Sequence, residues 1–203
     1  MLTMILAIVI LLFSVIVHEV AHGYVAYRLG DPTAKHAGRL TLNPIKHIDP
    51  MGTIVLPLVL LLLGSRFLVG WAKPVPVNPL YFRDPKRGMM IVGAAGPLAN
   101  ITLILLSALA LRLLAATMPP MLVDLLFYCC SINIVLALFN LIPVPPLDGS
   151  RVLAGILPPG IRAAYVGLER YGMLIILGLF FLGLMDQVIL PLYRVIFYLL
   201  VQA

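Results

Sequence analysis

The feature that most constrains this chain is a metal-binding motif inside a hydrophobic segment. Residues 2–17 carry no charged side chain, and H-E-x-x-H follows directly at residues 18–22. On a helix, positions i and i+4 share a face, so two imidazoles can reach one zinc ion while the intervening glutamate acts on its water. The next charged residue is Arg28, about 15 Å further along a helix than His18. The motif is therefore expected well inside an apolar layer.

An H-E-x-x-H match occurs by chance often enough that alone it would not identify a site. Here three ionisable groups fall within five residues of an apolar segment. Ionisable groups inside a membrane cost several kcal/mol and usually mark function. We therefore predict that His18 and His22 bind a metal and that Glu19 acts on its water.

The composition is that of an integral membrane protein. Charged residues make up 11% of the 203 residues and hydrophobic residues 62%, and the mean hydropathy is +1.10; ordinary globular chains have about 25% charged residues. The first apolar run has no basic leader or small-residue cleavage site, so we expect it to stay in the mature protein. The net charge of +6 fits cytoplasmic loops and does not imply a nucleic-acid partner. With no polar linker, residues 1–203 are expected to form one domain.

Hydrophobic stretches predict an all-α polytopic bundle of five or six transmembrane segments. The expected helical segments are, in chain order, about 2–29, 51–70, 88–117, 121–143, 147–157, 161–184 and 188–201.

The distribution of basic residues predicts the topology. The loop 31–50 is basic and is expected in the cytoplasm, with the N-terminus outside. A basic cluster at 83–87 would lie outside if 51–70 crossed the membrane, so we favour a re-entrant 51–70, although a full crossing remains open. Alternating residues at 38–43 and 71–77 predict short membrane-associated β ribbons, which could hold a substrate by strand addition or simply pack as loops.

A zinc protease site normally has a third protein ligand. Most of the other carboxylates lie beside glycine, proline or chain reversals, and Glu169 lies between two arginines. Asp148 instead follows a proline-rich break, and broken helices at membrane depth are tolerated where they line a cavity. It could instead cap the helix after it, a less favoured role that does not exclude metal binding.

The motif at 18–22, Gly-Pro-Leu-Ala-Asn at 96–100, and the Asn140 to Gly149 stretch together resemble the site-2 protease family, intramembrane zinc metalloproteases of the peptidase M50 type. The chain departs from better-known branches of the family because it has no PDZ or CBS insertion and carries the apolar segment 51–70, so we expect a short form. The resemblance implies a three-helix catalytic core, made by 2–29, 88–117 and 121–143 with 147–157, beside accessory segments 51–70, 161–184 and 188–201.

For the site, the resemblance implies one zinc ion held by His18, His22 and Asp148, with Glu19 as general base. Asn140 is then expected to contact the substrate or transition state. Asn133 lies seven residues earlier on the same face. We expect it to line a polar path to the metal and, with Asn140, to contact the substrate or transition state. The loop residues His36 and His47 could also line that path, but we expect them to be solvated.

The expected function is zinc-dependent hydrolysis of a peptide bond within or near a transmembrane helix of a membrane-protein substrate. The chain would act in the cell membrane, in contact with the lipid bilayer, with its active site open to the cytoplasm. An inactive membrane scaffold and a metal-ion transporter are the alternatives. A transporter should spread ionisable groups along a path, and a scaffold would not need Glu19.

The topology can be tested by cysteine labelling from outside the cell, in a background lacking Cys129 and Cys130. A cysteine replacing Asp84 should stay unlabelled by a membrane-impermeant reagent, and one replacing Asp186 should react. Labelling at position 84 would instead make 51–70 a complete span.

Overall fold

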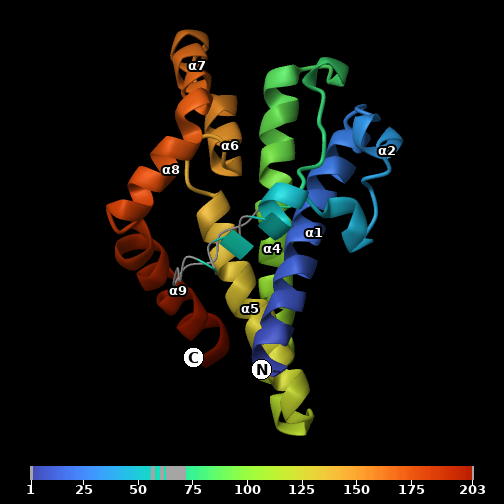
Figure 1. The fold of residues 1–203 in the computed structure, drawn as a ribbon, viewed down its shortest axis with the longest axis vertical. Coiled ribbons are helices and arrows are strands. Elements are labelled where there is room, and N and C mark those ends of the chain that lie inside the picture. Colours follow the sequence, from blue (N-terminus) through green and yellow to red (C-terminus); the bar gives the residue numbers. More distant parts are fainter. Residues whose placement is uncertain (1, 56–57, 60–61, 63–71, 203) are drawn as a thin grey trace.

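A computed structural model describes residues 2–55, 58–59, 62 and 72–202, and the structural statements below concern these residues. The described chain is helical and contains no strand (Figure 1). Short 3-10 and π-helical turns connect the α-helices. These are α1 Leu2–Arg28, α2 Thr33–His36, α4 Pro85–Leu114, α5 Pro120–Asn140, α6 Asp148–Ile156, α7 Pro159–Val166, α8 Gly172–Phe181 and α9 Leu190–Phe197.

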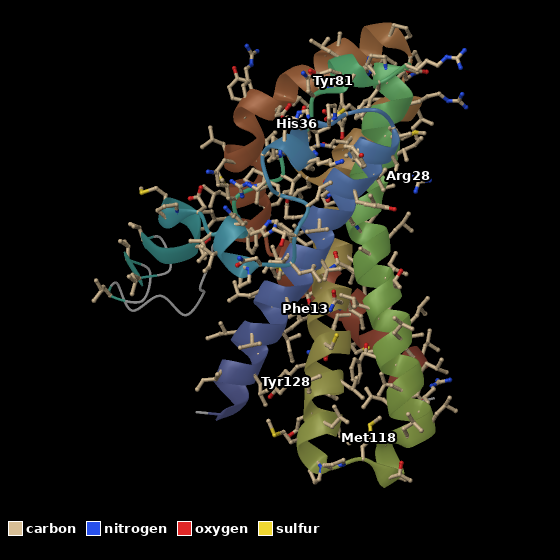
Figure 2. All side chains as sticks on the ribbon, turned by 90° about the vertical axis from the view of Figure 1, so that its right-hand side faces the viewer. Phe13, Arg28, His36, Tyr81, Met118 and Tyr128 are labelled. Atoms are coloured by element: carbon tan, nitrogen blue, oxygen red, sulfur yellow. The ribbon has the colours of Figure 1, made fainter. Side chains whose placement is uncertain are left out.

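Three long helices, α1, α4 and α5, pack side by side and form the centre of the molecule (Figure 2). The predicted three-helix core is therefore present as an arrangement of helices. Helices α4 and α5 meet through buried apolar side chains, and Phe197 of α9 packs against the same cluster. The buried members from α4 and α5 are Ile104, Ala108, Cys130, Ile134 and Ala137.

The ends of these helices follow from local sequence. Helix α4 begins three residues earlier than expected because Asp84 caps it: its Oδ1 accepts hydrogen bonds from the backbone N–H groups of Lys86 and Arg87. Pro85 occupies the first helical position, where no N–H is needed. Helix α5 ends at Asn140, just before the proline-rich segment 143–146, whose residues cannot continue the helical hydrogen bonds.

Four helices of the described chain are long and apolar enough to cross a membrane, fewer than the five or six predicted. They are Ile5–Arg28, Pro85–Thr117, Pro120–Asn140 and Pro159–Phe181. The expected span at 188–201 is not among them: α9 covers only eight residues there, between π-helical turns at Met185–Ile189 and Tyr198–Gln202. The predicted re-entrant segment 51–70 lies largely outside the described residues.

The predicted β ribbons are not confirmed, because neither 38–43 nor 72–77 forms a strand. In the segment 72–78, Pro74 and Pro76 have no N–H to offer a partner strand. Three of its other donors bond to separate parts of the chain instead of to one neighbouring strand. Lys73 N–H donates to the His47 carbonyl at 2.8 Å, Val75 N–H to Glu19 Oε2 at 2.8 Å, and Asn78 N–H to Asp31 Oδ2 at 2.6 Å.

Candidate metal centre

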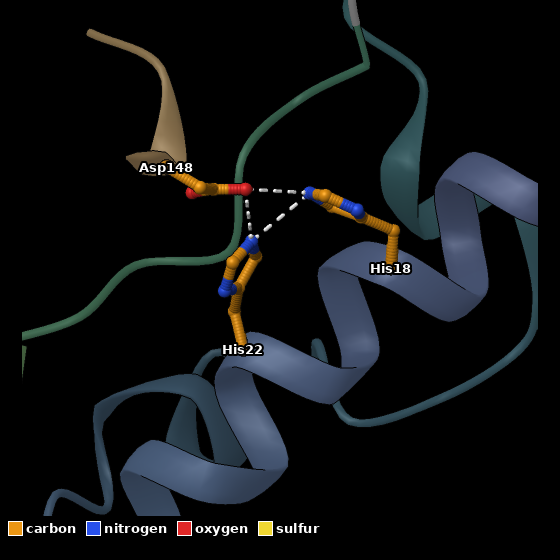
Figure 3. Close-up of side chains that lie close together, drawn as sticks. All are labelled: His18, His22 and Asp148. Atoms are coloured by element: carbon orange, nitrogen blue, oxygen red, sulfur yellow. Dashed lines mark hydrogen bonds and ion pairs between the residues drawn. The ribbon is translucent and has the colours of Figure 1, made fainter. Parts of the chain in front are cut away.

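Three side chains from distant parts of the sequence converge at one buried point (Figure 3). His18 and His22 lie one turn apart on α1, and Asp148 is the first residue of α6. His18 Nε2 is 3.0 Å from His22 Nε2 and 3.0 Å from Asp148 Oδ2. His22 Nε2 is 3.1 Å from the same carboxylate oxygen. These are the three ligands that the sequence predicted, and the structure brings them together.

The chain reversal between α5 and α6 places Asp148 in the cluster. Prolines end α5, and the chain then folds back so closely that Gly149 lies against the Leu141 and Ile142 carbonyls. A Cβ at Gly149 would collide with this backbone. Glycine is therefore required directly after the ligand, for reasons of space.

The outer nitrogen of each imidazole is fixed by an acceptor on α4. His18 Nδ1 lies 2.6 Å from Asn100 Oδ1, and His22 Nδ1 lies 2.7 Å from the Val92 carbonyl oxygen. Because both partners are acceptors, both Nδ1 atoms carry the proton and donate. The Nε2 lone pairs are left pointing into the cluster, as they do in histidines that bind metals.

The donor set fits a zinc ion. Two Nε2 lone pairs and a carboxylate oxygen lie within 3.1 Å of one another, and such acceptors repel unless a cation lies between them. Zinc binds nitrogen and oxygen at about 2.0–2.2 Å, which separates neighbouring ligand atoms of a tetrahedral site by about 3.3 Å.

Gly96 of α4 makes room for the two imidazoles. A Cβ at this position would overlap both rings. Gly93, one turn earlier, lies against Arg151 Cβ and the Asp148 carbonyl, so α4 and α6 are in close contact. Glycine at 93 thus allows close helix packing, and glycine at 96 creates the space for the two imidazoles.

Asn100 is a site residue that the sequence reasoning did not single out. It is fully buried and links His18 to a chain of polar groups across three helices. Its Nδ2 donates to Asn133 Oδ1 at 2.7 Å, and Asn133 Nδ2 donates to Ser14 Oγ at 2.8 Å and to the Cys129 carbonyl at 2.8 Å. The available signal was an amide side chain inside an otherwise apolar span.

The two asparagines predicted to contact substrate lie in different surroundings. Asn133 has no exposed surface, and its amide is engaged by other helices, so a role in touching substrate is not supported. Asn140 is half-buried at the end of α5 and donates to the Leu136 carbonyl at 2.9 Å. Its predicted contact with substrate stays a prediction.

Glu19 is half-buried, and its carboxylate accepts the 2.8 Å hydrogen bond from Val75 N–H. The two loop histidines are not part of the cluster. His36 is exposed on α2, as expected. His47 is buried, contrary to expectation, because its Nε2–H donates to the Thr41 carbonyl at 2.9 Å and packs the loop against itself.

Comparison with known proteins finds relatives that are named as zinc metalloproteases. Residues 114–182, which include Asp148, match the family model of Peptidase family M50. "Putative zinc metalloprotease YwhC" of Bacillus subtilis is 43% identical over 91% of this chain and 84% of its own length. "Putative zinc metalloprotease Rip2" of Mycobacterium tuberculosis is 31% identical over 83% of this chain and 64% of its own. "Zinc metalloprotease MJ0392" of Methanocaldococcus jannaschii is 27% identical over 73% and 33%. No solved structure matches.

Replacing a ligand should remove the metal. We expect about one zinc ion per purified chain, and His18→Ala, His22→Ala or Asp148→Ala should each lower the zinc content strongly, because only two ligands remain. Metal analysis of purified protein measures this. His36→Ala removes an exposed histidine outside the cluster and should keep the zinc. Full zinc content in Asp148→Ala would show that another group is the third ligand.

Asn100→Ala should weaken zinc binding about 10–100-fold, the usual effect of losing the partner that orients a metal-binding histidine. The measurement is a competition titration with a chelator. Ser107→Ala is the matched control, because Ser107 is buried in the same helix and donates to the Leu103 and Ile104 carbonyls of α4, not to a histidine of the cluster. Equal zinc affinity in both variants would contradict the orienting role of Asn100.

Proposed function

The chain belongs to peptidase family M50 and is a zinc metalloprotease, and from this we propose that it hydrolyses a peptide bond within or near a transmembrane helix of a membrane-protein substrate. The observation that carries the proposal is the depth of the metal cluster in an apolar helix. His18 and His22 lie within the candidate span Ile5–Arg28. In Figure 2 the labelled Phe13 and Arg28 mark α1 on either side of them.

The surroundings of the cluster support a membrane location. One face of α1 carries the ligands and packs against α4, while the other exposes large apolar side chains, including Ile5, Val9 and Phe13, each 45–57% exposed. A helix with an apolar outer face and a polar inner face suits lipid on one side and a catalytic interior on the other. A substrate for such a site would itself be embedded in the bilayer.

The residues of the cluster have distinct roles in the proposed reaction. His18, His22 and Asp148 would hold zinc, which supplies a Lewis acid that polarises the peptide carbonyl and acidifies a water molecule. Glu19 would take the proton from the attacking water and deliver it to the leaving nitrogen. The hydrogen bond from Val75 N–H orients the Glu19 carboxylate for both transfers.

A transmembrane substrate hides its carbonyls in helical hydrogen bonds and must unwind before it can be cut. The segment 72–78 lies beside Glu19. Its N–H groups at Lys73, Val75 and Asn78 already donate hydrogen bonds to other parts of the chain. The segment can therefore offer its backbone carbonyls as hydrogen-bond acceptors to an unwound substrate, but it has few N–H donors left. We propose that this segment holds the substrate in an extended form from one side only, through those carbonyls.

The orientation follows from the charges. Arg28, Lys35 and the basic residues at 83–87 gather where α1 ends and α4 begins, so we propose that this end faces the cytoplasm, in the cell membrane. The transporter alternative is not favoured, since the described residues contain one buried group of metal-binding side chains and not a series along a path. An inactive scaffold would have no use for Glu19 beside the ligands.

Glu19→Gln tests the chemistry directly. Glutamine keeps the shape and can still accept the Val75 hydrogen bond, but it cannot accept a proton. Hydrolysis should therefore fall toward the upper end of the 10²–10⁴-fold range, roughly, that general acid–base groups contribute, while zinc content is unchanged. The assay is cleavage of a single-span membrane protein with a helix-breaking Gly or Pro near its cytoplasmic end.

Asp124→Asn is the matched control, because it makes the same chemical change at an exposed residue of α5. It should cleave at the parent rate. Cleavage by Glu19→Gln at the parent rate would refute the proposed mechanism. If neither the parent nor the control cuts any membrane substrate while zinc is bound, the scaffold alternative is preferred.

A further inference from the structure

A cavity of about 180 Å³ lies between α4, α6 and α7, beside the helix that carries Asp148. Figure 1 shows α7 and α6 together at one end of the molecule, near the beginning of α4. The proposed protease mechanism makes no use of this cavity. The residues of its wall that matter here are Lys86, Ser150, Arg151, Arg162, Tyr165 and Glu169.

The cavity is lined by more positive than negative charge. Lys86 comes from α4, Arg151 from α6 and Arg162 from α7, and the one acidic residue in the wall is Glu169. Among the described residues, neither Lys86 nor Arg162 has a carboxylate within ion-pair distance, and Arg151 reaches only Asp148, at 4.0 Å. Three cations from three helices therefore line one space, and two of them have no ion-pair partner among the described residues.

The wall also carries hydrogen-bond donors that have no partner among the described residues. Arg162 Nε is buried and has no hydrogen-bond partner. Lys86 Nζ donates once, to the Leu157 carbonyl at 2.9 Å, which leaves two N–H groups. The hydroxyls of Ser150 and Tyr165 already donate their hydrogens to backbone carbonyls, so the basic side chains are the donors left for a ligand.

The walls are held in place by contacts that do not involve the charges. Gly155 of α6 packs directly on Met90 of α4, and Gly93 packs on Arg151 Cβ. Helix α7 is tied to the chain before α6 because Tyr165 OH donates to the Pro143 carbonyl at 2.8 Å. The cations therefore converge on a space whose shape is fixed by backbone packing.

We propose that this cavity binds a phosphate group, and that the headgroup of an anionic phospholipid supplies it. Phosphate oxygens accept several hydrogen bonds at once, and arginine is the side chain best suited to them. The cavity lies where the spans Pro85–Thr117 and Pro159–Phe181 begin, which is the level of lipid headgroups in the proposed orientation. Basic pockets between membrane helices on the cytoplasmic side commonly bind such headgroups.

The test is native mass spectrometry of the purified full chain in detergent. The protein is titrated with phosphatidylglycerol, with phosphatidylcholine of the same acyl chains, and with inorganic phosphate as competitor. The unmodified protein should bind phosphatidylglycerol more tightly than phosphatidylcholine. Arg162→Gln and Lys86→Gln should each weaken phosphatidylglycerol binding about tenfold, because each removes charge-assisted hydrogen bonds. Zinc content shows that each variant is folded.

Two further variants separate a specific site from general attraction. Glu169→Gln removes the acidic group from the wall and should tighten binding. Arg170→Gln makes the same charge change as Arg162→Gln at an exposed neighbour outside the wall, so it should alter binding by less than about twofold.

Each contrary result has a definite meaning. An equal loss in Arg170→Gln and Arg162→Gln, or weaker binding in Glu169→Gln, would overturn the site. Equal affinity for both lipids with strong competition by inorganic phosphate would make free phosphate the ligand. No preference for phosphatidylglycerol and no effect of phosphate would refute the proposal. None of these readouts depends on cleavage, so the result is independent of the proposed protease function.

Discussion

The central constraint on the structure is that the fold holds three mutually repelling acceptor atoms close together. Two imidazole lone pairs and a carboxylate oxygen lie 3.0–3.1 Å apart in a buried space. A cation held between the three atoms turns this repulsion into attraction. The rest of the bundle serves it: α4 fixes both Nδ1 atoms, Gly96 makes room for the rings, and the turn at Gly149 brings Asp148 into reach.

The polar chain behind His18 shows how a membrane interior accommodates such a site. Unsatisfied polar groups are costly where no water reaches them, so each buried amide has to be matched by a partner on another helix. The side-chain oxygen of Asn100 accepts from His18, and its nitrogen donates to Asn133. The nitrogen of Asn133 in turn donates to Ser14. The same bonds that orient His18 therefore also fix α1, α4 and α5 relative to one another.

Around the metal centre, the chain uses charge differently at two places. Glu19 and Asp31 are carboxylates that receive backbone N–H groups of the segment 72–78, so they hold an irregular segment against α1. Lys86, Arg151 and Arg162 instead line a cavity in which Arg162 Nε is buried without a hydrogen-bond partner. The first arrangement is satisfied within the chain, whereas the second leaves a donor of Arg162 unpaired, and we propose an anion as its partner.

The sequence alone determined whatever depends on neighbours along one helix. The i, i+4 spacing placed His18 and His22 on one face, uncharged runs marked the long spans, and the proline-rich break pointed to Asp148. Tertiary structure decided the partners that lie far apart: Asn100 meets His18 across 82 residues, and Val75 meets Glu19 across 56. No local pattern encodes the register between helices, so Asn133 could be read as a substrate contact and 72–77 as a strand. Only the packing of the helices shows which groups the Asn133 amide and the N–H groups of 72–77 bond to.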